Sequence, residues 1–194
     1  MSGSAYTFPQ LNNLPDAPEP VVEKAAGVEL IVMDVDGVLS DGHTWQLDNG
    51  EQLLCFSVQD ALSLTLCGLA GIKLAVISGR DLPAVRIRME RFPAVVELCL
   101  GCIHKEPALR EICERQGVPL ARTAYIGDDL IDLPLMSIVG LAVAVPNAVP
   151  EVLQAAAWCT ERPGGAGAVR DLITLVLKAR GLYVQAVESY LKEH

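Results

Sequence analysis

Two carboxylates two residues apart, Asp34 and Asp36, follow a short apolar run and precede Gly37. Both can face one site only if the chain turns there, and Gly37 permits that turn. Together they could share a hard cation and divide the work of a phosphoryl transfer, one attacking phosphorus and the other handling the proton of the leaving group. Taken alone, such a pair is more often a solvated acidic turn.

Two further segments carry groups that suit an anionic substrate. Ser78, Gly79 and Arg80 follow another apolar run, where a hydroxyl and free backbone N–H groups at the start of a helix would seat a phosphate. Serine is equally a good helix cap. Lys105 opens the next helical pattern and could neutralise both a phosphoryl group and nearby aspartates, although an isolated lysine is usually a surface residue.

The fourth segment, residues 127–132, holds three carboxylates, Asp128, Asp129 and Asp132. These repel one another unless a cation or a lysine offsets them, so one of them could complete an oxygen shell for Mg²⁺. Capping of a helix by Asp128 or Asp129 is the alternative. Each of the four segments is a weak signal by itself, but their joint occurrence in this order is specific and indicates one active site.

The elements that must position these residues alternate along the chain. Strands are predicted at residues 29–33, 72–77, 95–100, 123–126 and 141–145, and helices at 61–70, 82–91, 106–116, 130–138, 148–156, 168–179 and 183–192. This alternation predicts an α/β fold, a Rossmann-like doubly wound and mostly parallel sheet with helices on both faces. The four segments follow strands, so they should meet at the carboxyl edge of the sheet.

One stretch interrupts the alternation. Residues 44–47 and 52–56 are strand-like and flank Asn49 and Gly50, a pair that favours a tight hairpin turn. We therefore predict a β-hairpin flap directly after the first strand. No other gap is long enough for a cap domain, so the site should be open or closed by another subunit.

The chain fits one domain at residues 26–194, preceded by an extended or disordered arm at residues 1–25, where four prolines interrupt any periodic pattern. Hydrophobic residues make up 51% of the chain and aromatic residues only 5%, which is typical of a buried parallel sheet. The six cysteines lie mostly in apolar stretches and are interpreted as free thiols. Cys99, Cys102 and His104 could form half a zinc site, but no second pair completes it.

The net charge of −9 and the pI near 4.8 argue against binding to nucleic acid, because phosphates repel an acidic surface. No apolar run approaches the roughly eighteen residues of a membrane span, and residues 1–20 lack the basic and apolar regions of a signal peptide. We therefore predict a cytoplasmic protein with no membrane partner.

In this order the four segments resemble the motifs of the haloacid dehalogenase superfamily, from residue 29 to the C-terminus. The likeness is closer to the small capless 3-deoxy-D-manno-octulosonate 8-phosphate phosphatases. It rests on residues 34–42, 49–51, 125–132, 139–141 and 164–170. The resemblance implies a Mg²⁺-dependent hydrolase of a phosphorylated keto-sugar acid, a place in lipopolysaccharide biosynthesis, and a homotetramer whose subunits cover each other's sites.

By position, the resemblance makes Asp34 the nucleophile that forms an aspartyl-phosphate and Asp36 the general acid and base. Mg²⁺ would be held by Asp34, the backbone carbonyl of Asp36 and Asp128. Phosphoryl oxygens would be bound by Ser78 and Lys105. The residues expected to contact the substrate are Ser57, Asp60, Ser78, Gly79, Arg80, Arg88 and Lys105.

The chain departs from this family at Gln59 and Thr65, where arginines are expected. An arginine pairs bidentately with a sugar carboxylate and is hard to replace, so a nine-carbon keto-sugar phosphate or another small sugar phosphate stays open as the substrate. A phospho-accepting signalling receiver is a competing interpretation, disfavoured by the chain length and the hairpin. A non-catalytic paralogue is another, disfavoured by the intact Asp36 and Asp128.

Overall fold

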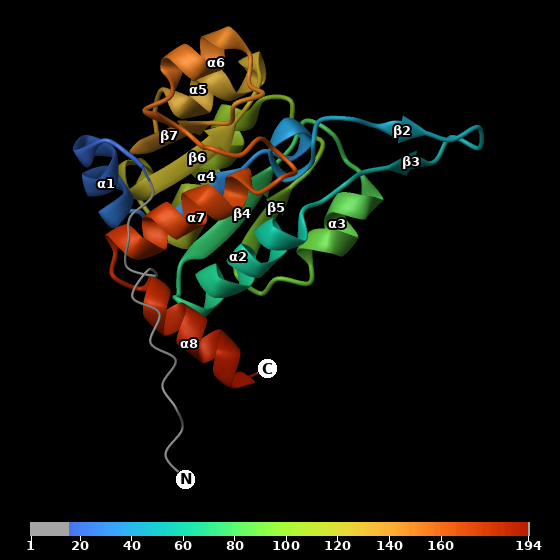
Figure 1. The fold of residues 1–194 in the computed structure, drawn as a ribbon. Coiled ribbons are helices and arrows are strands. Elements are labelled where there is room, and N and C mark those ends of the chain that lie inside the picture. The colour runs from blue at the N-terminus through green and yellow to red at the C-terminus, as the bar shows by residue number, and fades with distance from the viewer. Residues whose placement is uncertain (1–15, 194) are drawn as a thin grey trace.

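The computed structural model describes residues 16–193, and its centre is a six-stranded sheet in the order β5-β4-β1-β6-β7-β8 (Figure 1). All neighbouring strands in this sheet are parallel. The strands are β1 (Leu30–Met33), β4 (Lys73–Ile77), β5 (Val95–Cys99), β6 (Thr123–Gly127), β7 (Leu141–Ala144) and β8 (Trp158–Cys159). The predicted α/β fold is confirmed. Strand β8 was not predicted, because two residues are too few to show a periodic pattern.

Helices cover both faces of the sheet, which is why β1, β6 and β7 are buried throughout. Helices α1, α2, α7 and α8 pack together in one layer, while α4, α5 and α6 form another (Figure 1). The helices are α1 (Glu19–Ala26), α2 (Val58–Leu69), α3 (Pro83–Met89), α4 (Lys105–Gln116), α5 (Leu133–Met136), α6 (Pro150–Ala155), α7 (Ala168–Ala179) and α8 (Tyr183–Glu193), with short irregular turns η2 (Val35–Leu39), η3 (Leu120–Arg122) and η4 (Leu130–Asp132).

The prediction of an extended or disordered arm at residues 1–25 is wrong for residues 19–25. Residues 1–15 of this arm lie outside the part of the chain that the structure describes. Residues 19–25 belong to α1, which packs on α7 and buries Val21 and Ala25. The sequence pattern misled because proline was taken as a helix breaker. Pro20 lies in the first turn of the helix, where its missing N–H has no partner to lose.

The hairpin flap is present as β2 (Trp45–Gln46) and β3 (Gln52–Leu53), which project away from the sheet (Figure 1). The tight Asn-Gly turn predicted for it is wrong. The Leu47 N–H donates to the Glu51 carbonyl and the Gly50 N–H to the Leu47 carbonyl, both at 2.9 Å, so three residues form the loop. Gly50 alone takes a positive φ, of +86°, whereas a two-residue Asn-Gly turn needs positive φ at both residues.

The single helix predicted over residues 130–138 divides into η4 and α5. The division falls at Asp132, whose side chain turns back to accept backbone N–H groups of the preceding turn. Among residues 16–193, no helix has the length and apolar character needed to cross a bilayer.

Candidate active site

The structure brings the four predicted segments together at the carboxyl edge of the sheet. Asp34 follows β1, Ser78 follows β4, Lys105 opens α4 after β5, and Asp128 follows β6. Carboxylate oxygens of Asp34, Asp128 and Asp132 lie within 4.8 Å of one another. This convergence follows from the parallel sheet, because neighbouring parallel strands deliver the residues after their last positions to one place.

Lys105 is at the centre of this cluster and is only 2% exposed, so it is not the surface residue that an isolated lysine usually is. Its Nζ atom donates to Asp34 Oδ1 at 2.8 Å and to Asp132 Oδ1 at 2.7 Å. Burial by itself lowers the pKa of Lys105, but the two carboxylates outweigh burial and raise it above the ordinary value. The lysine is therefore a buried cation that offsets two of the three acidic groups.

Asp132 is a residue to which the sequence assigned no role, and the structure makes it the organiser of the loop after β6. One oxygen, Oδ2, accepts the backbone N–H groups of Asp128 and Asp129 at 2.9 and 3.2 Å. The other, Oδ1, accepts from Lys105 and from the hydroxyl of Tyr125 at 2.7 Å. The position four residues after Asp128 was the available signal, but the spacing could not show which of the acids turns inward.

The remaining acids have the properties of a site for a hard cation. Burial and the neighbouring charge of Asp132 raise the pKa of Asp34 to about 6, although Lys105 lowers it in part. Burial and the charge of Asp34 raise the pKa of Asp128 to about 8. The Oδ1 atom of Asp128 is buried and accepts no hydrogen bond from the described residues. An oxygen-binding divalent cation such as Mg²⁺ would use that lone pair and favour the ionised forms, so the residues fit it.

Asp34 directly precedes the irregular turn η2 and Asp36 lies in it, and close contacts at glycines shape this turn. Gly37 has a φ of +86°, and a Cβ atom there would lie 2.0 Å from Asp128 Oδ2. On its other side, a Cβ atom on Gly164 would lie 1.7 Å from the Gly37 carbonyl oxygen. Gly164 and Gly165 therefore pack backbone to backbone against residues 37–41, an approach that only residues without a side chain allow.

Asp36 pairs with Arg80 rather than with the buried cluster. Arg80 Nη1 donates to Asp36 Oδ1 at 2.8 Å and to Thr44 Oγ1 at 3.1 Å, and Nη2 donates to Gln52 Oε1 at 2.6 Å. Thr44 directly precedes β2, and Gln52 lies in β3 of the hairpin. The guanidinium thus links the flap to the acid that the sequence predicts as general acid and base.

Ser78 is 1% exposed and its Oγ atom accepts the backbone N–H of Arg80 at 3.1 Å, with Gly79 between them. The predicted phosphate seat at the start of a helix is wrong in detail. Helix α3 begins only at Pro83, because the segment before it forms bends. Any phosphate here would meet a serine hydroxyl and loop N–H groups, not a helix terminus.

A small cavity apart from the acidic cluster is lined by three residues that were predicted to contact substrate, Ser57, Asp60 and Arg88. Ser57 caps α2, and Asp60 Oδ1 accepts the Arg170 N–H at 2.8 Å near the start of α7. The three residues line a cavity of about 10 Å³, which is room for about one water molecule and not for a sugar. The structure does not place these side chains in the carboxylate cluster.

Gln59 stands where the family resemblance predicts an arginine, and a guanidinium from elsewhere reaches it. Arg162 Nη1 donates to Gln59 Oε1, and the same guanidinium forms an ion pair with Asp171. Thr65, the other departure, donates to the backbone carbonyl of Ala61 within α2.

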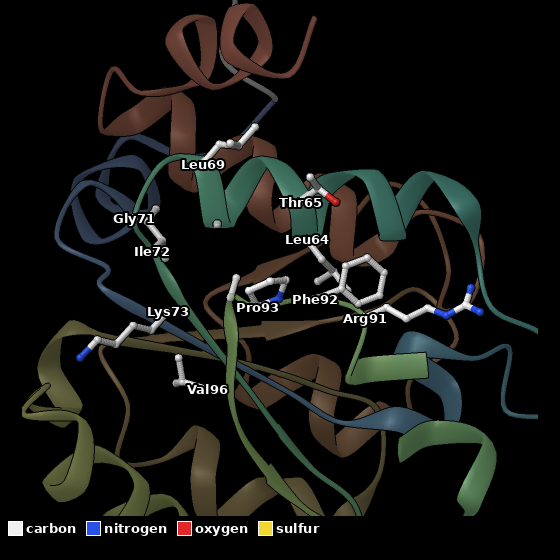
Figure 2. Close-up of a pocket in the computed structure, with 12 residues that line it drawn as sticks. Leu64, Thr65, Leu69, Gly71, Ile72, Lys73, Arg91, Phe92, Pro93 and Val96 are labelled. Carbon is white, nitrogen blue, oxygen red and sulfur yellow. The ribbon is translucent and has the colours of Figure 1, made fainter. Parts of the chain in front are cut away.

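A larger cavity, of about 470 Å³, lies at the opposite end of the strands (Figure 2). Its lining is mainly apolar and includes Leu64 from α2, Phe92 and Val96. Figure 2 shows the charged ends of Lys73 and Arg91 pointing away from it. No acid of the cluster lines it, so this cavity is not part of the candidate site.

Comparisons with known proteins give a consistent picture. The family model described as haloacid dehalogenase-like hydrolase matches residues 89–171. A 3-deoxy-D-manno-octulosonate 8-phosphate phosphatase from Salmonella typhi is 39% identical over 161 residues, covering 83% of this chain and 85% of that protein. The Escherichia coli K12 protein of the same name is 38% identical over the same length.

Solved structures extend the likeness to three dimensions. The 3-deoxy-D-manno-octulosonate 8-phosphate phosphatase from Moraxella catarrhalis, determined with a magnesium ion, a phosphate ion and KDO, has a TM-score of 0.84 and 34% identity, covering 88% of this chain and 97% of that one. The enzyme of the same name from Yersinia pestis has a TM-score of 0.83 and 36% identity, covering 85% and 89%.

Proposed function

Because the chain belongs to the haloacid dehalogenase-like hydrolases and is a phosphatase of that family, we propose that it hydrolyses 3-deoxy-D-manno-octulosonate 8-phosphate with Mg²⁺ as cofactor, a step of lipopolysaccharide biosynthesis. The observation that carries the proposal is the convergence of Asp34, Lys105 and Asp128, three groups that a phosphoryl transfer needs at one point. The likeness to relatives named for this substrate supplies the substrate class.

In the first step, a carboxylate oxygen of Asp34 attacks phosphorus, forming an aspartyl-phosphate and breaking the bond between phosphorus and the sugar oxygen. Asp36 gives a proton to the departing sugar oxygen. In the second step, Asp36 takes a proton from water, the resulting hydroxide attacks phosphorus, and inorganic phosphate leaves with Asp34 restored. Asp36 thus begins and ends the cycle in the same protonation state.

Charge and position supply most of the catalysis in such a transfer. Asp34, the backbone carbonyl of Asp36 and Asp128 would hold Mg²⁺. When bound, the ion neutralises charge on the phosphoryl oxygens. Lys105 adds a second positive charge from the protein side, and Ser78 offers a hydroxyl to a phosphoryl oxygen. Residues 16–193 contain no cap domain, which fits hydrolysis because water can reach the aspartyl-phosphate.

We further propose that the chain acts in the cytoplasm as a homo-oligomer, a tetramer by family likeness. The hairpin supports an assembly because it exposes three large apolar side chains outside the body of the domain. Trp45 is 69% exposed, Leu53 55% and Leu47 41%. A patch of this kind on a projecting element is typical of a contact surface. Light scattering at micromolar concentration tests this proposal, and a monomer would contradict it.

The function is tested by measuring phosphate release with Mg²⁺ over a panel that contains 3-deoxy-D-manno-octulosonate 8-phosphate, a nine-carbon keto-sugar acid phosphate and simple hexose phosphates. We expect the eight-carbon substrate to give the highest kcat/KM. The nine-carbon compound is included because Gln59 replaces an expected arginine. If no sugar acid phosphate exceeds the hexose phosphates, the proposed substrate is wrong.

The nucleophile is tested in the same assay with Asp34→Asn, which keeps the shape of the side chain and removes its nucleophilic charge. We expect kcat to fall by roughly a thousandfold or more, as for the loss of other nucleophiles. Turnover at the wild-type rate would show that Asp34 is not the attacking group.

A further inference from the structure

Asn147, in the loop between β7 and α6, links two segments of the site that are far apart in sequence. Its Nδ2 atom donates to the Gly37 carbonyl at 2.9 Å, and its Oδ1 atom accepts the Gly164 N–H at 2.8 Å. One side-chain amide therefore donates to the η2 turn and accepts from residues 164–167. Among side chains, an amide suits this arrangement because it carries a donor and an acceptor side by side.

The same loop also bonds to the backbone of Asp128, another acid of the cluster. The Val149 N–H donates to the backbone carbonyl of Asp128 at 2.9 Å. Residues 147–149 are thus bonded both to Gly37, which follows β1, and to Asp128, which follows β6. Because Asp128 packs directly on the backbone of Gly37, this loop fixes the separation of the two segments that would supply ligands to one cation.

Gly37 needs such external support. Its φ of +86° is accessible to glycine, but glycine also has the widest choice of other conformations, so its own backbone does not hold it there. The peptide between Asp36 and Gly37 carries the carbonyl assigned above to Mg²⁺. A rotation about Gly37 would turn that carbonyl and would also move the surface on which Asp128 rests.

We propose that Asn147 is a positioning residue of the metal site. It holds the Gly37 peptide so that the Asp36 carbonyl and the Asp128 carboxylate face the same cation. The inference rests on the proposed Mg²⁺-dependent function. Asn147 acts through Gly37 and Gly164 and is assigned no contact with substrate or metal.

The test compares Asn147→Ala, which removes both hydrogen bonds, with Asn147→Asp, which keeps the acceptor for the Gly164 N–H and loses the donor. Mg²⁺ affinity is measured by calorimetry and by the rise in Tm that Mg²⁺ produces. We expect the Kd for Mg²⁺ to rise by about tenfold or more in Asn147→Ala, the usual effect of losing a residue that supports metal ligands. The rise in Kd should be smaller in Asn147→Asp. Gln154→Glu, at an exposed amide on α6, is the control for the added charge.

A second readout separates positioning from a purely structural role. If Asn147 positions the metal ligands, raising the Mg²⁺ concentration should restore much of the phosphatase rate of Asn147→Ala. A lower Tm without Mg²⁺ combined with an unchanged Kd would indicate structural support alone and overturn the inference. Wild-type Mg²⁺ affinity in Asn147→Ala would overturn it and leave the proposed function standing. Failure of the wild-type protein to bind Mg²⁺ would overturn both.

Discussion

Asp128 lies directly against the backbone of Gly37, so closely that a Cβ atom on Gly37 would fall 2.0 Å from Asp128 Oδ2. Gly37 also has a positive φ of +86°. Two physical constraints therefore act at one residue: the backbone conformation disfavours any other amino acid, and the acidic side chain leaves no space for one. Gly50 in the hairpin loop has the same φ of +86° but no atom within 4 Å of the equivalent position.

This pair of glycines separates the two constraints. Gly50→Ala should lower the free energy of unfolding by about 1–2 kcal/mol, the cost of placing a residue other than glycine at a positive φ, and should leave activity unchanged. Gly37→Ala should cost more in unfolding free energy and should abolish phosphate release, because Asp128 must move away from the proposed cation site. Denaturant unfolding and the phosphate assay measure both effects. Equal losses of stability and activity in the two variants would contradict the role given to the contact with Asp128.

Lys105 provides a second prediction, because it is the buried partner of two carboxylates. Lys105→Met should destabilise the fold by about 3–5 kcal/mol, since removing one member of a buried ion pair leaves its partners desolvated and unpaired. Activity should be lost as well. Arg110→Met on the same helix is the matched control: its pair with Glu106 is exposed, so the cost should stay below about 1 kcal/mol. A Lys105 variant as stable as that control would contradict the buried pairing.

The hairpin contact of Arg80 gives a third prediction. Gln52→Leu removes the acceptor that holds Arg80 Nη2 at 2.6 Å and should loosen the guanidinium beside Asp36. We expect kcat/KM to fall roughly two- to tenfold with little change in Tm, because one hydrogen bond of about 1 kcal/mol at an exposed site is lost. Gln46→Leu is the control, since Gln46 bonds to Gln52 and not to Arg80. Equal values of kcat/KM for both variants would show that the contact between Gln52 and Arg80 does not contribute to catalysis.

The sequence predicted the position of Asp34, Ser78 and Asp128 because each stands at the end of an apolar run, and the length of such a run determines where a buried strand ends. The prediction that Lys105 could neutralise nearby aspartates is confirmed by its bonds to Asp34 and Asp132. The sequence did not predict the inward turn of Asp132. That turn depends on which of several polar groups finds a partner, and Lys105 and Asp132 are 27 residues apart. Asn147 was missed for the same reason, with one partner 110 residues away.

Gln59 marks a different limit of the sequence. The pattern showed that an expected arginine is missing, but the guanidinium that reaches this position comes from Arg162, which stands 103 residues later. Only the packing of the chain near α7 against the start of α2 brings the two together. A comparison of motifs can therefore show that a charged residue is missing at one position without showing that a guanidinium from a distant residue reaches that position.

The thiol of Cys99 allows a prediction about pH. Burial, together with the hydrogen bond and charge of Cys102, raises the pKa of Cys99 to about 11. Since the thiolate is the reactive form, a raised pKa moves reactivity to higher pH. At pH 8 only about one Cys99 in a thousand should be ionised, whereas an ordinary thiol with a pKa near 8.5 would be about one-quarter ionised.

The rate of Cys99 alkylation by iodoacetamide in the folded protein should therefore rise about tenfold per pH unit from pH 7 to near pH 10 without levelling off. Tandem mass spectrometry distinguishes Cys99 from Cys102, and circular dichroism confirms that the protein stays folded at each pH. The urea-unfolded chain is the control, in which the rate should level off above about pH 9 because the thiol regains its ordinary pKa. A folded-state rate that levels off below pH 9 would show that burial does not hold Cys99 in its protonated form.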